Sequence, residues 1–311
     1  MGSALLQAVA VLGALALAAY VLAAMDRLLG LRLAGKDLSG ALLEPLAGGL
    51  RLMGREDVVP EMVDRQLYPL GPVYFFAAVF VAFTIIPLAP GWIAADLSTG
   101  ILFFQAVVIQ AAVALLMGGW GANSRGGLGG AMRFVGQLVA YAIPFALTTV
   151  TAGMVAGSLK TTAVVESQAA LTWNIILQPL GFVVFFVSMF AVGFWSPFDL
   201  ADTGTELAGG VAGEYTGPRL ALFRLAHLAL ILSLASFTVV VFLGGWLGPL
   251  LPPALWFVIK LLLVLAAMVW VRHRMLRVRI DQLMAAAWKI LIPLALVNVA
   301  WVGILLLLVG R

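Results

Sequence analysis

Apolar residues along the chain gather in eight long runs, separated by shorter polar segments. Each run is about twenty residues long, the length that an α-helix needs to cross the hydrocarbon core of a bilayer. Because lipid offers the backbone no hydrogen-bonding partner, these runs are expected to be helices. The sequence thus predicts an all-α, polytopic membrane protein with a single membrane domain over 1–311. The predicted transmembrane helices cover residues 3–24, 71–94, 100–119, 132–157, 172–194, 219–245, 253–271 and 288–308.

A helix of another kind is predicted between the first two spans. In "LSGALLEPLAGGLRLMG", Leu43, Leu46 and Leu50 recur at helical spacing, while Glu44 and Arg51 share a different face. Such an amphipathic pattern is typical of an interfacial helix that lies on the lipid headgroups. A role in admitting a ligand would leave the same pattern, and the residues alone do not separate the two interpretations.

Charge then orients the chain in the membrane. Of its 18 Lys and Arg, fifteen lie in or beside loops on one predicted side, mainly 25–70, 195–218 and 272–287. The positive-inside rule makes these loops cytoplasmic and places both termini on the outer side of a bacterial inner (plasma) membrane. The first run is too long for the apolar part of a signal peptide, so we interpret it as a retained span. The net charge of +4 follows from this topology and does not indicate a nucleic-acid partner.

Composition limits the chemistry of this chain. It is 63% hydrophobic and only 10% charged, and it has no Cys. Its two histidines, His227 and His273, are far apart in sequence, so no ligand set for an iron–sulfur cluster, haem or zinc is apparent and no metal site is expected. No carboxylate falls within a predicted span, and His227 and Lys260 are the ionisable residues inside apolar runs. A self-sufficient pump or transporter is therefore poorly supported.

The stretch "WSPFDLADTGTELAGGVAGEYTGPR", residues 195–219, carries unusual acidity for such an apolar chain. Ser196 could cap a helix that begins at Pro197, with an acid in its first turn. The first three acids, however, follow one another at spacings of three and four, which stacks like charges unless cations or a partner answer them. The basic segment "RHRMLRVR" on the same predicted side could supply these cations. The four acids of the stretch are Asp199, Asp202, Glu206 and Glu214.

These motifs resemble the H subunit of bacterial respiratory complex I, the proton-pumping NADH:quinone oxidoreductase and counterpart of mitochondrial subunit 1. "SPFDLADTGTEL" followed by "GEYTGPRLALF" is similar to the hallmark loop of that family. "REDVVPEMVDRQLYPLGPV", "GWGANSRGGLGGAMRFVGQLVAY", "GGWLGPLLPPALWFVIK" and "RVRIDQLMAAAWKILIPLALVN" resemble other family segments in the same order. The resemblance covers nearly the whole chain.

The resemblance implies a membrane subunit that forms the quinone chamber and the junction to a cluster-bearing peripheral arm. It implies quinone as the substrate of the complex, other membrane and peripheral subunits as partners, and no cofactor-bearing catalytic site in this chain. The acidic loop would couple quinone reduction to proton translocation, because the charge at the quinone site changes during reduction. By resemblance, the basic residues near that loop are Arg27, Arg272, Arg277 and Arg279.

The chain departs from the family at several positions. "GKDLSGALL" stands where the family has a glycine–proline–asparagine–arginine motif, and Trp195 replaces a usual arginine. Family acids are replaced by Met25, Ala142, Gly204 and His227. His227 could still relay protons, or it could serve only as an interhelical polar contact. A structural membrane anchor of a partial complex I or hydrogenase-like assembly, without quinone or proton chemistry of its own, is therefore the alternative function.

A quinone chamber needs an apolar passage that opens to lipid and ends at polar groups. We expect such a passage between the first span, the segment 40–53 and the sixth span, ending near Asp199 and the arginines. Gly48 and Gly49 would let a flat ligand pass close to the backbone. Loss of the glycine–proline–asparagine–arginine motif could instead have closed it.

Overall fold

The computed structural model describes residues 2–38, 40–170, 172–200 and 210–309. Over these ranges the chain is helical, with no named strand and one isolated bridge between Ala89 and Trp92. The elements in chain order are α1 (Gly2–Leu33), α2 (Leu43–Met53), α3 (Leu67–Phe83), α4 (Gly100–Gly121), α5 (Arg125–Ala156), α6 (Thr161–Ala170), α7 (Asn174–Leu177), α8 (Pro179–Val192), α9 (Gly210–Gly213), α10 (Gly217–Phe242), α11 (Pro253–Arg274), α12 (Ile280–Ala286), the π-helical turn η1 (Ala287–Leu291) and α13 (Ile292–Val309).

The predicted all-α membrane class is confirmed. Within the described ranges, five helical segments are long and apolar enough to cross a bilayer: α4, α5, α10, α11 and the continuous stretch Ile280–Leu308. The helices α3 and α8 are apolar but shorter, and α1 covers the first predicted span. The amphipathic pattern at 40–53 forms the short helix α2.

Two predicted spans are shortened or interrupted in the structure. The second ends at Phe83 rather than at 94, because "IPLAPGW" places two prolines and a glycine where a helix would need backbone donors and regular dihedrals. The fifth is divided at Gln178, directly before Pro179, where the following ring disfavours the helical conformation. Residues 84–94, which were predicted to continue the second span, belong to an irregular connection that runs to residue 99.

The helix α10 forms the centre of the bundle. It is flanked by α3, α11, α1 and α2 and also contacts α6, and its apolar window is 83% buried. A helix that is apolar all round is expected at such a position. Lipid tails are as apolar as leucine, so packing rather than exclusion of water holds such helices together. At the core, the rings of Phe104 and Phe237 stack with centroids 3.9 Å apart.

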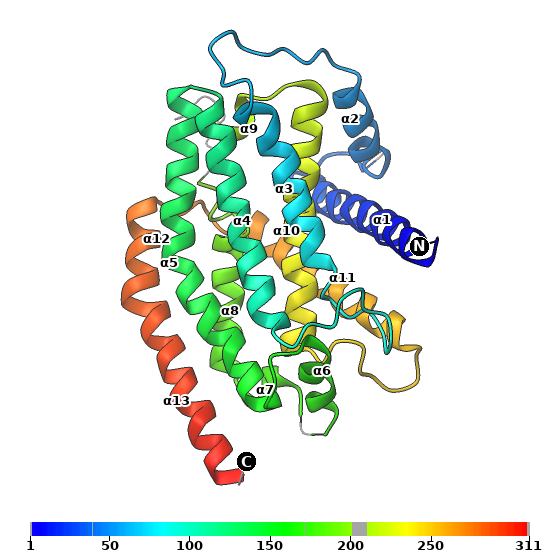
Figure 1. Ribbon diagram of the computed structural model, residues 1–311, viewed down its shortest axis with the longest axis vertical. Helices are drawn as coiled ribbons and strands as arrows, with labels where there is room; N and C mark the ends of the chain where they lie inside the picture. The colour runs from blue at the N-terminus through cyan, green and yellow to red at the C-terminus, as the bar shows by residue number, and fades with distance from the viewer. Residues whose placement is uncertain (1, 39, 171, 201–209, 310–311) are drawn as a thin grey trace.

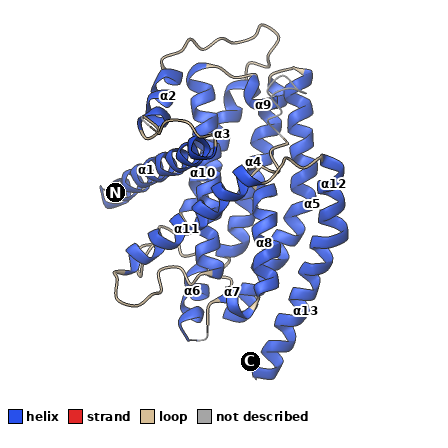
Figure 2. Cartoon of the chain, turned by 180° about the vertical axis from the view of Figure 1, so that it is seen from behind, coloured by secondary structure: helices blue, strands red, loops and turns tan. Residues whose placement is uncertain are grey.

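Two pairs of helices lie on opposite sides of this bundle. α1 and α2 lie on one side, and α12 and α13 lie on the other, as the view from behind shows (Figure 2). α1 runs obliquely to the near-vertical α3, α5 and α10 (Figure 1). α1 also contacts α11. The contact between α1 and α11 brings together two segments that are about 250 residues apart in sequence.

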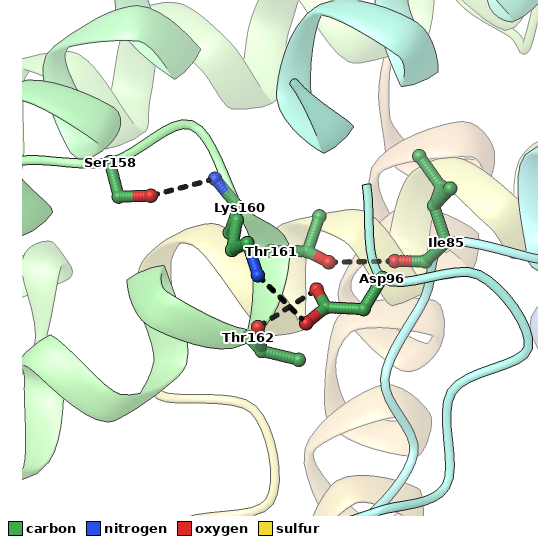
Figure 3. Close-up of polar contacts among 6 residues, drawn as sticks. All are labelled: Ile85, Asp96, Ser158, Lys160, Thr161 and Thr162. Atoms are coloured by element: carbon green, nitrogen blue, oxygen red, sulfur yellow. Dashed lines mark hydrogen bonds and ion pairs between the residues drawn. The ribbon is translucent and has the colours of Figure 1, made fainter. Parts of the chain in front are cut away.

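The end of the bundle that carries α6 and α7 is tied by polar contacts (Figure 3). The Lys160 Nζ lies 3.3 Å from Asp96 Oδ2, and the Thr162 hydroxyl donates to Asp96 Oδ1 at 3.0 Å. The Thr161 hydroxyl donates to the Ile85 carbonyl at 2.9 Å. The irregular connection 84–99 is thereby fixed to the start of α6.

Close packing of α4 on α5 generates a first prediction. A Cβ at Gly119 would lie 2.5 Å from the Gly127 carbonyl oxygen and 2.9 Å from the Ala131 Cβ, so the helices would have to separate. Gly119→Ala is expected to lower the free energy of unfolding by about 1–3 kcal/mol, measured by detergent denaturation followed by circular dichroism. Gly136→Ala on α5, where a Cβ meets nothing within 4 Å, is the control. Equal stability of the two variants would contradict this account of the interface.

Candidate functional site

The candidate site begins where the end of α1 meets the end of α11. The Asp26 carboxylate lies 3.1 Å from Arg272 Nη1 and 3.1 Å from His273 Nε2, so two consecutive side chains of α11 share one acid of α1. Asp26 is 24% exposed, which leaves the pair only partly screened by water. Gly30 permits the contact, since a Cβ there would lie 3.1 Å from the His273 ring.

An aromatic layer lies directly beneath this ion pair. The Arg272 guanidinium sits over the Trp195 ring, 4.2 Å from its centroid, and Trp195 is buried. The Trp195 ring meets His227 of α10 edge-on at 5.8 Å. His227 stacks on Phe194 with centroids 3.9 Å apart, and its Nε2 lies 3.1 Å from the Gly193 carbonyl oxygen. A continuous series of contacts therefore joins the surface acid Asp26 to a histidine inside the bundle.

The acidic loop is docked onto the segment that follows α11. Arg277 Nε lies 3.1 Å from Asp199 Oδ1, and the same guanidinium donates to the Asp199 carbonyl. The Val278 amide donates to the Pro197 carbonyl at 3.1 Å. The helix expected to begin at Pro197 is absent from the described residues 193–200, which form turns. The Pro197 and Asp199 carbonyls are engaged by the 277–278 segment instead of by a following helical turn.

The far end of the acidic stretch is anchored separately. The Ser124 hydroxyl, which also accepts from the Gly127 amide as the N-cap of α5, donates to Glu214 Oε1 at 2.5 Å. The Tyr215 ring stacks on Tyr68 at 4.5 Å, and each hydroxyl donates to a backbone carbonyl across the pair. Burial raises the pKa of the Tyr215 hydroxyl, so it remains a donor at neutral pH. Glu214 is thus part of a helix junction.

The sequence-predicted residues are distributed over several contacts. Asp199 and Arg277 meet as the charge pattern suggested, whereas Arg272 pairs with Asp26. Arg27 contacts Glu44 of α2, with its Nη2 at 2.5 Å. Arg279 is exposed at the start of α12. Asp202 and Glu206 lie outside the described residues.

Sequence reasoning missed three residues of the site, Asp26, Trp195 and Ser124. Asp26 is the first charge after the N-terminal apolar run, and this position was a usable signal for a partly buried ion pair near a helix end. Trp195 was noted only as a replacement for an arginine. Its role as a platform for Arg272 depends on the packing of the segment after α8 against α11, which no local pattern encodes. Over the described ranges, no group of three His, Asp or Glu residues is placed to bind a metal.

The elements expected to enclose an apolar passage do meet one another. α2 contacts both α1 and α10. Leu46 and Leu50, however, are 53% and 63% exposed and therefore face away from the chain. A small pocket of about 40 Å³ lies elsewhere, between α4, α5 and α8, beside Ala142 and Gln105.

Comparisons with known proteins agree with this architecture. A family described as NADH dehydrogenase matches residues 3–303. This chain belongs to that family. Two curated relatives, each named as the H subunit of NADH-quinone oxidoreductase, come from Dehalococcoides mccartyi strains CBDB1 and ATCC BAA-2266 / KCTC 15142 / 195. They are 39% and 38% identical over 257 residues, which cover 83% of this chain and 72% of each relative. The resemblance inferred from the motifs is confirmed, and the apolar helices of this NADH dehydrogenase family member mark it as a membrane protein.

The shared carboxylate of Asp26 generates a second prediction. In a double-mutant cycle with Asp26→Asn and Arg272→Gln, the coupling free energy of unfolding is expected to be about 0.5–1 kcal/mol, as for partly exposed ion pairs. Arg274→Gln, at an exposed position two residues further on, should show no coupling to Asp26. Coupling of the same size for Arg274 would indicate a general charge effect and not the observed contact.

Proposed function

We propose that this chain is the membrane subunit that forms the quinone chamber of an NADH-quinone oxidoreductase and couples quinone reduction to proton translocation. The names of the two relatives support the enzyme assignment. The proposal further assigns the site around Asp26, Trp195, Asp199 and Arg277 to the polar end of the chamber. In this function the chain contributes to the oxidoreductase as a subunit, with quinone as the substrate of the complex.

One observation carries the proposal. The acidic loop at Asp199 is bound by Arg277, and four residues earlier the same loop supplies Trp195, which contacts both Arg272 and His227. A change of charge near this loop would act on the loop, on α1 through Asp26 and on α10 through His227. An element that contacts several helices at once can transmit a charge change at a redox site to groups that move protons.

The membrane topology is part of the proposal. In this proposal α1, α3 and the α7–α8 pair cross the membrane in addition to the five long apolar helical segments, which would make eight spans. With the arginine-rich loops in the cytoplasm, both termini lie on the outer side of a bacterial plasma membrane. The cytoplasmic loops would then face cluster-bearing peripheral subunits, and the exposed apolar faces of α11 and α13 would face lipid or other membrane subunits.

The amphipathic helix α2 is the proposed entrance for quinone. Its exposed leucines, Leu46 and Leu50, form an apolar face that can lie among the lipids. Its opposite side is joined to α1, because Glu44 pairs with Arg27. A quinone tail passing between α2 and the oblique helix α1 would bring its headgroup toward Asp26 and Trp195.

A third prediction tests the role of the loop with a matched pair of charges. The double variant Asp199→Asn, Arg277→Gln should lower quinone reduction by about tenfold, because the loop loses the contact that positions it beside Trp195. The control is Asp96→Asn, Lys160→Gln, an ion pair of similar exposure at the α6–α7 end (Figure 3). Activity is measured in purified complexes with equal subunit content.

Equal loss of activity at both pairs would remove the reason to place the quinone site at Asp199. Normal activity in both would favour the alternative, a membrane anchor that supports a peripheral arm without handling quinone. Selective loss of the whole complex in the Asp199 variant, with the control intact, would instead indicate a docking role for the loop.

A fourth prediction concerns His227. His227→Gln keeps a side-chain donor for the Gly193 carbonyl but removes the titrating ring. In reconstituted vesicles this variant is expected to translocate fewer protons per electron while quinone reduction continues. An unchanged ratio of protons to electrons would show that His227 serves only as a contact between α10 and the end of α8.

A further inference from the structure

Lys260 of α11 lies far from the site described above, in a closely fitted environment. The residue is 4% exposed. Its Nζ donates to the carbonyl oxygens of Leu243 at 2.6 Å, Gly245 at 3.1 Å and Leu247 at 2.6 Å. The same nitrogen lies 4.4 Å from the centroid of the Trp173 ring. Three oxygen acceptors and one aromatic face thus surround a single nitrogen atom.

The connection after α10 is shaped so that alternate carbonyls converge. Gly244 and Gly245 have φ values of +71° and +51°, in the left-handed region that favours glycine. A Cβ at Gly245 would lie 2.7 Å from Val165 Cγ2, and one at Gly244 would lie 3.1 Å from Trp173 Nε1. The Gly245 amide donates to the Val239 carbonyl at 2.9 Å, which fixes the turn against α10. Two adjacent glycines therefore curl the backbone around the nitrogen.

The three carbonyl acceptors around the Lys260 nitrogen determine which chemical groups can occupy this position. A protonated primary amine has three N–H donors and no acceptor, which matches three carbonyl oxygens. A neutral amine has two donors and would turn its lone pair toward the third carbonyl. The aromatic face adds an attraction for positive charge. A quaternary ammonium ion, which has no N–H groups, would satisfy the ring but leave the three carbonyls without a donor.

We propose that the carbonyls of Leu243, Gly245 and Leu247 and the ring of Trp173 form a binding site for a primary ammonium group. In the native chain Lys260 fills this site as a tethered ligand. Its charge and its three donors join α11 to the end of α10 and to the segment that leads into α7. The site is specific for N–H donors, and it would accept a free alkylammonium ion once the tether is removed.

The other lysine at the α6–α7 end provides a contrast. Lys160 contacts one carboxylate at 3.3 Å, and its side chain is 43% exposed. Such a pair contributes little and is screened by salt. Removing the Lys260 ammonium instead leaves three oriented carbonyls without a partner, which is far more costly.

Chemical rescue tests the proposal without any measurement of enzymatic activity. Lys260→Ala removes three carbons and the nitrogen, the atoms of n-propylammonium. The full chain is purified in detergent, and the half-life of its thermal unfolding is measured from the decrease of the folded fraction with time. The half-life of the variant is expected to be shorter than that of the wild type by on the order of tenfold. Millimolar propylammonium should restore it with saturation, whereas tetramethylammonium and NaCl at equal ionic strength should not.

Wild type and Lys160→Ala are the controls, and neither should respond to propylammonium. A response of equal size in these controls, or rescue by tetramethylammonium, would overturn the proposal, because the effect would then be nonspecific or independent of N–H donors. Absence of rescue at any concentration in a folded Lys260→Ala protein would overturn it as well.

A second variant covers the case in which Lys260→Ala does not accumulate. Lys260→Met keeps an apolar stem of similar volume but has no charge or donor. Its accumulation in membranes should fall well below that of Lys160→Met. Equal accumulation and equal half-life of these two methionine variants would show that the site needs no ammonium group and would refute the proposal.

Discussion

Polar groups inside this bundle must find their partners within the protein, and the arrangement of the helices depends on that constraint. Lipid competes equally well for leucine and phenylalanine, so apolar contacts alone do not choose one helix packing over another. Polar contacts between helices do favour one packing over others. Asn298 of α13 donates to Thr151 of α5 and to Gln178, and this fixes the outer helix at one depth. The Asn174 side-chain amide likewise donates to the Val241 carbonyl of α10.

The same constraint explains the form of the candidate site. Asp26 lies about two turns before the end of α1 and Arg272 lies in the last turn of α11, and at both positions an unpaired charge would be partly desolvated. They meet because α1 packs against α11, and Trp195 covers the guanidinium. His227 is then kept in place by two aromatic rings and one backbone carbonyl. Charge near the surface and a titratable ring in the interior are thus parts of one packed unit.

The general fold could be predicted from the sequence, because long apolar runs have few other solutions in a bilayer. Their boundaries were harder to predict. Hydropathy extended the second span through Pro87 and Pro90, and it missed the polar first turns of α5 at Arg125. Hydropathy measures the affinity for lipid, whereas a helix ends where backbone dihedrals and caps require it.

The candidate site could be predicted only where local chemistry sufficed. Asp199 and Arg277 carry opposite charges on the same predicted side, and they do pair. The pairing of Arg272 with Asp26 depends on the packing of two helices from opposite ends of the chain, and sequence spacing does not reveal which distant helices will meet. The carbonyls around Lys260 could not be predicted for a related reason. Every residue has a backbone carbonyl, so the residue types do not show which carbonyls converge on one side chain.

The shortness of α3 has a consequence for the bilayer itself. Its 17 residues extend about 26 Å at about 1.5 Å per residue, less than the roughly 30 Å thickness of a typical hydrocarbon core. Lipids beside α3 must therefore thin, or the irregular connection that follows must enter the apolar layer. Its backbone is suited to such depth, because Ala95 bonds to Thr84, Leu88 bonds to Trp92, and Thr161 satisfies Ile85. The connection after α3 is thus expected to complete within the apolar layer the crossing that α3 leaves short.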